Sequence, residues 1–201
     1  MLLVRGLVFL VAILVATEGD AQSLAEALAS SAIERTSHNV RYDGSYVRLD
    51  YPNGDVPDDT GVCTDVVIRS YRALDIDLQQ LVHEDMNLAF SHYPSRRIWG
   101  LGQPDSNIDH RRVPNLQKFF ARHGDKLEVS DKPGHYEVGD IVTWMLPGNL
   151  PHIGIVVGNP EGGLGNPLVV HNIGSGPKLE DVLFRYPITG RYRFLPAAVN
   201  S

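Results

Sequence analysis

Cys63, His152 and His171 are the residues whose chemistry stands out in this sequence. A cysteine that attacks a carbonyl carbon needs a base within hydrogen-bond distance of its sulfur, and a third group that orients this base. Cys63 is the single cysteine of the chain, so it cannot form an internal disulfide. The three residues are therefore candidates for a nucleophile, a base and an orienting group, which together would perform acyl transfer.

The residues around Cys63 predict that it lies in the first turn of a helix. Thr60 is a suitable helix N-cap, and apolar residues from Val66 to Leu74 recur at near-helical spacing. A thiol at this place meets the positive end of the helix dipole and several free N–H groups, which favour the reactive thiolate. The alternative is that Cys63 is a small buried hydrophobic residue, as most free cysteines are.

Two adjacent residues, His171 and Asn172, compete for the role of the third group. His152 shares one face of its strand with Gly154, whereas His171 and Asn172 point to opposite faces of the next strand. The pairing register decides which of them faces His152, and the irregular loop between the strands leaves that register open. We prefer His171, with Asn172 as the alternative, and expect Gly154 to leave room for the backbone of the Cys63 helix.

The expected fold has helices first and strands afterwards. Helical patterns occur at 22–37, 63–74, 78–90 and 114–122. Strands are expected at 139–145, 152–158, 168–173 and 190–195. The remaining segments read as a short hairpin at 40–49, a loop at 51–57 and polar turns at 91–112. Short connections between the strands favour antiparallel pairing, so the fold class is α+β, with helices packed on an antiparallel sheet.

The first 21 residues have the features of a cleavable secretory signal. A basic start precedes an apolar run at 6–16, and the small residues Gly19 and Ala21 form a cleavage site. The run is too short to span a bilayer comfortably, and no nearby cysteine could carry a lipoprotein anchor. We expect residues 22–201 to form a single soluble domain, periplasmic or secreted, with no integral membrane segment after cleavage.

The charge balance argues against nucleic acid or an anionic membrane as a partner. The chain has 18 basic and 24 acidic residues and a formal net charge of −6, which becomes −5 when Arg5, Glu18 and Asp20 leave with the leader. A lone thiol in an oxidising compartment is a liability unless it has a function. Its presence in an exported protein therefore favours a chemical role for Cys63.

Several motifs resemble known families. The order of cysteine, histidine and polar residue, with Gly139-Asp140-Ile141-Val142 just ahead of His152-Ile153-Gly154-Ile155-Val156, resembles the NlpC-type papain-like cell-wall peptidases. More closely, the stretches GVCTD, NIDHRR, GDIVTW and HNIG are similar to a bacterial exported domain-of-unknown-function family related to that superfamily. The close resemblance covers most of 42–194, and the superfamily match is confined to the cysteine and the two histidine strands.

The resemblance implies a papain-like fold and hydrolysis of amide bonds in peptidoglycan stem peptides, without a metal or another cofactor. It makes Cys63 the nucleophile, His152 the general base and His171 the residue that orients the base. Tyr51 is a looser match to a tyrosine near the oxyanion site. The sequence departs from the superfamily at one place. The superfamily usually has Ser-Gly after its cysteine, whereas this chain has Thr64-Asp65, and this difference bears on the substrate.

Further candidates for substrate binding are Asp65, Arg111, Arg112 and Trp144. A guanidinium of Arg111 or Arg112 could bind a substrate carboxylate, although a structural network is the commoner role for such residues before a helix. Asp65 could instead stabilise the first helical turn, and Trp144 could belong to the core. A divalent metal site is the minority interpretation of a polar set that matches no zinc signature, namely His83, Asp85, Asp105, Asp109 and His110.

Three other functions are compatible with these residues. An acyltransferase would use the same triad but pass the acyl group to an amine. A non-catalytic wall-binding or inhibitor-like module would keep the fold without using the thiol. A metal-dependent hydrolase would lose its activity on chelation. In the preferred interpretation the partner is peptidoglycan or a peptide substrate, and no residue pattern identifies a regulatory partner.

Overall fold

The computed structural model describes residues 18–159 and 165–196. The α-helices of this part of the chain are α1 Glu18–Arg35, α2 Cys63–Arg72, α3 Leu78–Ala89, α4 Ser95–Trp99 and α5 Val113–His123. Single 3-10 turns occur at η1 Phe90–His92, η2 Asp109–Arg111 and η3 Pro133–His135.

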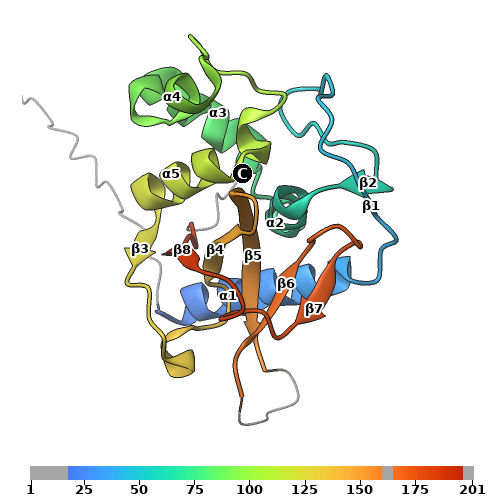
Figure 1. The fold of residues 1–201 in the computed structure, drawn as a ribbon, viewed down its shortest axis with the longest axis vertical. Helices are drawn as coiled ribbons and strands as arrows, with labels where there is room; N and C mark the ends of the chain where they lie inside the picture. Colours follow the sequence, from blue (N-terminus) through green and yellow to red (C-terminus); the bar gives the residue numbers. More distant parts are fainter. Residues whose placement is uncertain (1–17, 160–164, 197–201) are drawn as a thin grey trace, which may run out of the picture.

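A six-stranded sheet lies at the centre of the molecule (Figure 1). Its strands in chain order are β3 Asp125–Leu127, β4 Ile141–Leu146, β5 Leu150–Gly158, β6 Leu168–His171, β7 Lys178–Glu180 and β8 Ile188–Arg193. They lie side by side in the order β3-β8-β4-β5-β6-β7, and each neighbouring pair is antiparallel. A separate parallel pair joins β1 Arg41–Tyr42 to β2 Thr60–Gly61. The predicted α+β class with an antiparallel sheet is therefore confirmed.

The two faces of the sheet carry separate hydrophobic cores. The larger core lies on the helix side, where Ile153 and Ile155 of β5 pack with residues of α1, α2, α3 and α5. The smaller core includes Trp144 and Val156, which pack with Leu183 from the segment between β7 and β8. Because strand side chains alternate, neighbouring residues of β4 and β5 enter different cores.

Three local predictions are wrong. Residues 40–49 do not form a hairpin, because Arg41–Tyr42 pairs with Thr60–Gly61 instead. The polar stretch 91–112 contains the short helix α4. Strands β3 and β7 have no counterpart in the prediction, because each is only 3 residues long and too short for a visible alternation.

The predicted leader lies mainly on residues 1–17, outside the described part of the chain, and the predicted cleavage point after Ala21 falls within α1. Within residues 18–159 and 165–196, no helix combines the length and the hydrophobicity needed to cross a bilayer.

The start of α2 is stabilised by Asp65 and not by Thr60. The Asp65 carboxylate accepts the N–H of the N-cap residue Val62 at 2.7 Å, from a helical position where the dipole also favours negative charge. The Thr60 hydroxyl instead donates to the Pro57 carbonyl at 2.9 Å. The predicted Thr60 cap is therefore wrong, because Thr60 belongs to strand β2.

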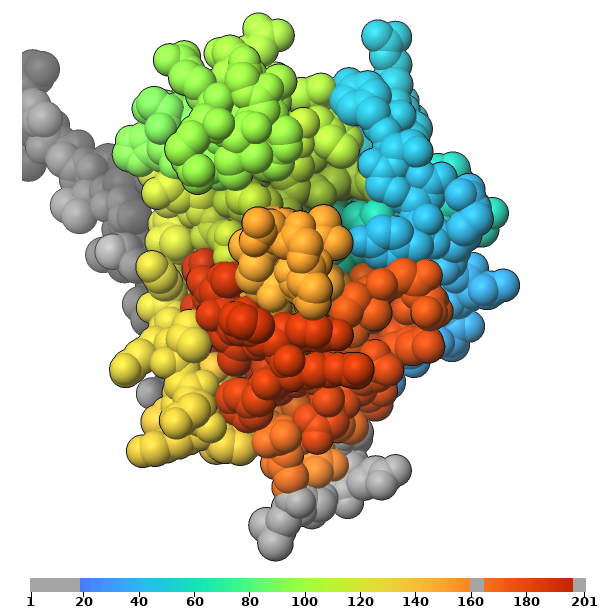
Figure 2. Space-filling view, in the orientation of Figure 1, coloured from blue at the N-terminus to red at the C-terminus, as the bar shows by residue number. Residues whose placement is uncertain are grey.

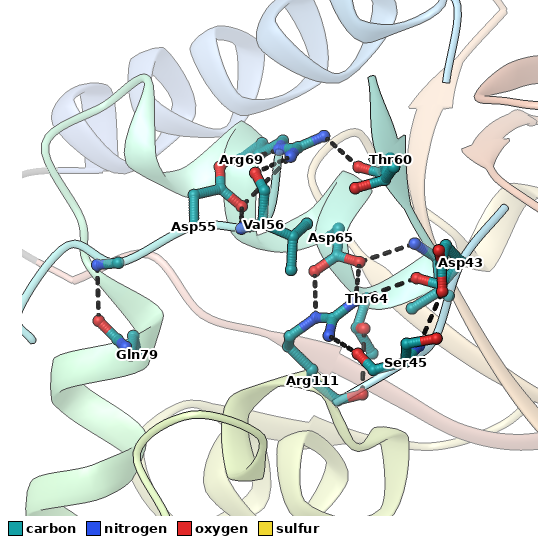
Figure 3. Close-up of polar contacts among 12 residues, drawn as sticks. Asp43, Ser45, Asp55, Val56, Thr60, Thr64, Asp65, Arg69, Gln79 and Arg111 are labelled. Atoms are coloured by element: carbon teal, nitrogen blue, oxygen red, sulfur yellow. Dashed lines mark hydrogen bonds and ion pairs between the residues drawn. The ribbon is translucent and has the colours of Figure 1, made fainter. Parts of the chain in front are cut away.

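Arg111 of η2 joins the start of α2 to distant segments (Figure 3). Its Nε and Nη2 donate to the two carboxylate oxygens of Asp65 at 2.8 and 2.9 Å. It also donates to the carbonyls of Ser45 and Asp43 at 3.2 and 3.3 Å. Burial acts to lower the pKa of Arg111, but the hydrogen bonds and charge of Asp65 outweigh it and the pKa is raised. A charged guanidinium therefore holds together α2, η2 and the segment after β1.

Arg69 of α2 anchors the loop that leads to Cys63 (Figure 3). Its guanidinium donates to Asp55 at 2.9 Å, and to the carbonyls of Thr60 at 3.1 Å and Val56 at 3.0 Å. The loop before the cysteine is thus tied to the helix that follows it.

We predict that Arg111→Met lowers the free energy of unfolding by about 3–5 kcal/mol, because it leaves the buried Asp65 carboxylate without its ionic partner. Urea denaturation measures this change. The control is Arg96→Gln, which removes an exposed cation from α4, and should change stability by less than about 0.5 kcal/mol. Equal effects of the two substitutions would contradict the structural role of Arg111.

Candidate functional site

Cys63 is the first residue of α2 and its side chain is buried in the larger core, with 5% of its surface exposed. Burial raises the pKa of the thiol to about 12. Backbone N–H groups of Ile153, Thr64 and Cys63 itself act in the opposite direction, and the charge of Asp65 adds to the increase. For Cys63 the loss of hydration therefore outweighs the helix N-terminus, which favours the buried neutral thiol of the two alternatives.

His152 and His171 lie next to each other on β5 and β6. The Nε2 atom of His152 is 2.9 Å from Nδ1 of His171, and the rings meet nearly at right angles. The register pairs Gly154 with His171, so His171 shares the face of His152 and Asn172 points to the other face. The structure therefore brings together His152 and His171, and not His152 and Asn172.

Glu180 of β7 extends this pair to a chain of three residues. Its Oε2 atom lies 3.0 Å from Nε2 of His171. Glu180 was not among the predicted site residues, because β7 is too short to be recognised from its pattern. No local sequence signal marks Glu180, whose relation to His171 arises only from the pairing of β6 with β7.

The chain of contacts determines where each proton lies. An ionised Glu180 can only accept, so the Nε2–H of His171 donates to it and the Nδ1 atom of His171 accepts. The Nε2–H of His152 then donates to His171, which leaves a lone pair on Nδ1 of His152. Burial lowers the pKa of His152 to about 3, and the charge of His171 contributes further. Burial also lowers the pKa of His171 against the opposing effect of Glu180. Both imidazoles are therefore neutral at pH 7.

Trp144 supports His152 from the neighbouring strand and does not line a surface. It pairs with His152 across β4 and β5, with ring centroids 5.8 Å apart. Its side chain is buried, and its indole N–H donates to the Leu183 carbonyl at 2.9 Å. The prediction that Trp144 binds substrate is therefore wrong, because this tryptophan belongs to the smaller core.

The sulfur of Cys63 lies beside the backbone of β5, whereas the imidazole of His152 is on the face of β5 that carries the smaller core. Ile153 shares the larger core with Cys63, and its N–H is directed at the sulfur. Within the described residues, no hydrogen bond joins the sulfur to the imidazole of His152. The imidazole of His152 and the N–H that is directed at the sulfur belong to consecutive residues of β5, His152 and Ile153.

The charge of Cys63 contributes to the pKa of Tyr42 but not to that of Tyr51. Burial raises the pKa of Tyr42 to about 12, and the charges of Cys63 and Asp65 contribute. The ring of Tyr51 instead packs edge-on against His83, with centroids 5.1 Å apart. The role of Tyr51 at the oxyanion site therefore stays a prediction, while the β1–β2 pairing places Tyr42 beside Gly61.

The other predicted ligands of substrate are already occupied by contacts within the chain. Asp65 and Arg111 form the buried bidentate pair at the start of α2. Arg112 contacts Asp109 at 3.2 Å, and its guanidinium lies 4.1 Å from the centre of the Trp99 ring. Asp65 and Arg111 therefore have the structural role that was the commoner alternative for them, since their polar atoms bind each other. Arg112 stays a candidate at the protein surface.

Two of the residues considered for a metal, Asp85 and Asp109, are likewise used by the fold. Asp85 binds Arg122 at 2.7 and 2.9 Å, and these hydrogen bonds hold the pKa of Asp85 well below its usual value. Asp109 is buried and binds Arg112 and Asn115. Among the residues that the structure describes, no group of three His, Cys, Asp or Glu side chains could hold a metal ion.

Gly154 makes room for β6 and not for the Cys63 helix. A Cβ atom at this position would lie 2.8 Å from Val169 Cγ1, 2.9 Å from the Val170 carbonyl oxygen and 3.1 Å from His171 Cβ. Another backbone does approach Gly154 closely, as expected, but it is the backbone of β6, which carries His171. Gly154 therefore permits the spacing at which the two histidines meet.

We predict that iodoacetamide alkylates Cys63 slowly at pH 7, and that the rate still rises above pH 9, because a raised thiol pKa delays formation of the thiolate. Mass spectrometry of the native protein across pH measures this rate. The control is the urea-unfolded chain, whose thiol should titrate near the model value of about 8.5. A plateau below pH 7 in the native protein would show a resting thiolate and contradict the prediction.

Comparisons with known proteins identify the family of this chain. A protein-family model described as a domain of unknown function, DUF1287, matches residues 29–194. The uncharacterized protein YijF of Escherichia coli (strain K12) is 51% identical over 168 residues, which cover 84% of this chain and 80% of that protein. The matched region contains the cysteine helix and both histidine strands, and on this basis the chain belongs to the DUF1287 family.

Proposed function

We propose that this protein is an exported cysteine hydrolase of papain-like type, in which Cys63, His152 and His171 act on an amide bond. The observation that carries the proposal is the His152–His171–Glu180 chain, which leaves a lone pair on Nδ1 of His152. His152 directly precedes Ile153, whose N–H is directed at the Cys63 sulfur. A lone cysteine at a helix start and an oriented neutral imidazole are the parts that nucleophilic catalysis by a thiol requires.

In the proposed reaction, Nδ1 of His152 takes the proton of the Cys63 thiol, and the sulfur attacks the carbonyl carbon of the substrate. Backbone N–H groups at the start of α2 stabilise the oxyanion. His152 then gives its proton to the leaving amine as the C–N bond breaks, which leaves a thioester on Cys63. Water attacks the thioester with His152 as base, and the proton returns to the sulfur as the carboxylic acid leaves.

The proposal requires a rearrangement at the end of β5. At rest the thiol and the imidazole are both neutral, and neither group is among the causes that shift the pKa of the other. Substrate binding must therefore bring Nδ1 of His152 within hydrogen-bond distance of the sulfur. Catalytic hydrogen bonds that are long or absent in a free enzyme often form only in the complex with substrate.

The substrate and location follow from the resemblance to NlpC-type peptidases. We propose amide bonds in peptidoglycan stem peptides as the substrate, and the periplasm or the exterior of the cell as the site of action. The hydrophobic start of the sequence and the unpaired cysteine support an exported protein with a chemical role.

One observation favours a second candidate, a non-catalytic module that binds the cell wall. Cys63 is buried, and burial raises the pKa of its thiol, as expected for a cysteine that only fills space. The two candidates differ in one respect that can be measured. The wild-type module would bind sacculi without releasing soluble fragments.

We predict that wild-type protein releases soluble muropeptides from purified sacculi, and that Cys63→Ala lowers kcat roughly a millionfold, as is typical when a nucleophile is removed. Mass spectrometry of the products identifies the bond that is cleaved. Circular dichroism of the variant controls for folding. Equal digestion by Cys63→Ala would disprove the hydrolase, and products that carry an added amine would identify an acyltransferase.

We also predict that Glu180→Leu lowers kcat roughly 10- to 100-fold with little change in KM, the range seen when an outer partner of a functional histidine is lost. Glu180 acts through His171 as a positioning residue, so the nitrogen-15 shifts of His171 should also report a changed tautomer. Asp181→Asn is the control, because it removes the adjacent carboxylate, which binds Asn166. An unchanged His171 tautomer in Glu180→Leu would contradict this role even if activity fell.

A further inference from the structure

A groove of about 730 Å³ lies away from the histidine chain, between α4, α5 and the edge of the sheet. In Figure 2 the green part of the chain, which includes α4, lies above the yellow part with α5 and β3, and the red C-terminal part lies beside the yellow one. The lining residues come from the η1–α4 segment, α5, β3 and β8. None of them is Cys63, His152, His171 or Glu180, so the groove is separate from the candidate site.

Four cations line this groove, namely Arg96, Arg97, Lys118 and Lys126. No Asp or Glu of the described residues is among its lining. Within the same part of the chain, none of the four cations forms an ion pair, whereas Arg69, Arg111, Arg122 and Arg191 are all paired with carboxylates. The chain as a whole has more acidic than basic residues, so this concentration of positive charge is not a consequence of composition.

The floor of the groove is rigid and partly apolar. Tyr93 and Tyr192 are buried, with 4% of each exposed, and Tyr93 is held by a hydrogen bond to Asp85. Pro94 and Pro114 lie beside them. Cations around a concave and rigid surface focus the electric field, which raises the local concentration of anions. Arginine forks are suited to bidentate contact with carboxylate or phosphate oxygens.

We propose that this groove binds a small ligand that carries two or more carboxylate or phosphate groups. Arg96 and Arg97 come from α4, whereas Lys118 comes from α5 and Lys126 from β3, so a ligand with separated anionic groups can contact cations of different elements. The size of the groove lies within the range of small-molecule sites, about 300–1,000 Å³. The proposal does not depend on the hydrolase, because it concerns different residues.

The test is isothermal titration of the full chain with sodium pyrophosphate and, separately, with citrate, at pH 7 and low ionic strength. We expect binding of at least one of the two anions at a single site. Binding of pyrophosphate alone would indicate a phosphate ligand, and binding of citrate alone would indicate a carboxylate ligand. The variant Arg96→Gln/Lys118→Gln should weaken binding roughly tenfold or more, since it removes two charged hydrogen-bond donors from the groove.

The matched control is Arg48→Gln/Lys132→Gln, which removes the same charge from exposed positions outside the groove. It should leave the affinity within about twofold of the wild type, because neither residue lines the groove and so neither can bind the ligand directly. If neither anion binds, or if both double variants lose affinity equally, the proposal is overturned. Thermal unfolding of each variant confirms that a loss of binding is not a loss of fold.

Discussion

The buried pair of Asp65 and Arg111 is the interaction on which the arrangement of the cysteine helix depends. Asp65 satisfies the first free amide of α2 and, through Arg111, connects this helix to η2 and to the segment after β1. Each partner is expensive to bury alone, so the pair holds only when all three segments are in place. The position of Cys63 is therefore a property of the assembled tertiary structure, and not of α2 by itself.

Two opposing effects act on the thiol at the start of this helix. Amide dipoles favour the anion, and they are the reason that helix starts often carry reactive cysteines. Burial disfavours any charge, and for Cys63 it is the larger effect, as it also is for the imidazole of His152. The result is a set of neutral groups held in order by hydrogen bonds. Such a set has no reactivity until something changes its solvation or geometry, which would restrain a hydrolase that acts on the wall of its own cell.

Much of the fold, and part of the candidate site, could be predicted from the sequence. Helices α2, α3 and α5 and strands β4, β5, β6 and β8 have clear periodicity, and His152 and His171 stand on strands that were expected to be neighbours. The partnership of Asp65 with Arg111 could not be predicted in detail, because the two are 46 positions apart. Glu180 and Tyr42 lie on strands of 3 and 2 residues, where no pattern can develop. The sequence could not decide between a thiolate and a buried neutral thiol, because local sequence reports the helix start and not the burial.

The strand order has a consequence for how the molecule behaves at high concentration. The outermost strands β3 and β7 are each 3 residues long and carry charged residues, Asp125 and Lys126 at one border and Lys178 and Glu180 at the other. Unpaired amides at the border of a sheet invite pairing with another chain, and short charged border strands are a common protection against it. A second copy of the chain could therefore form few backbone hydrogen bonds with either edge strand, which opposes fibril-like aggregation.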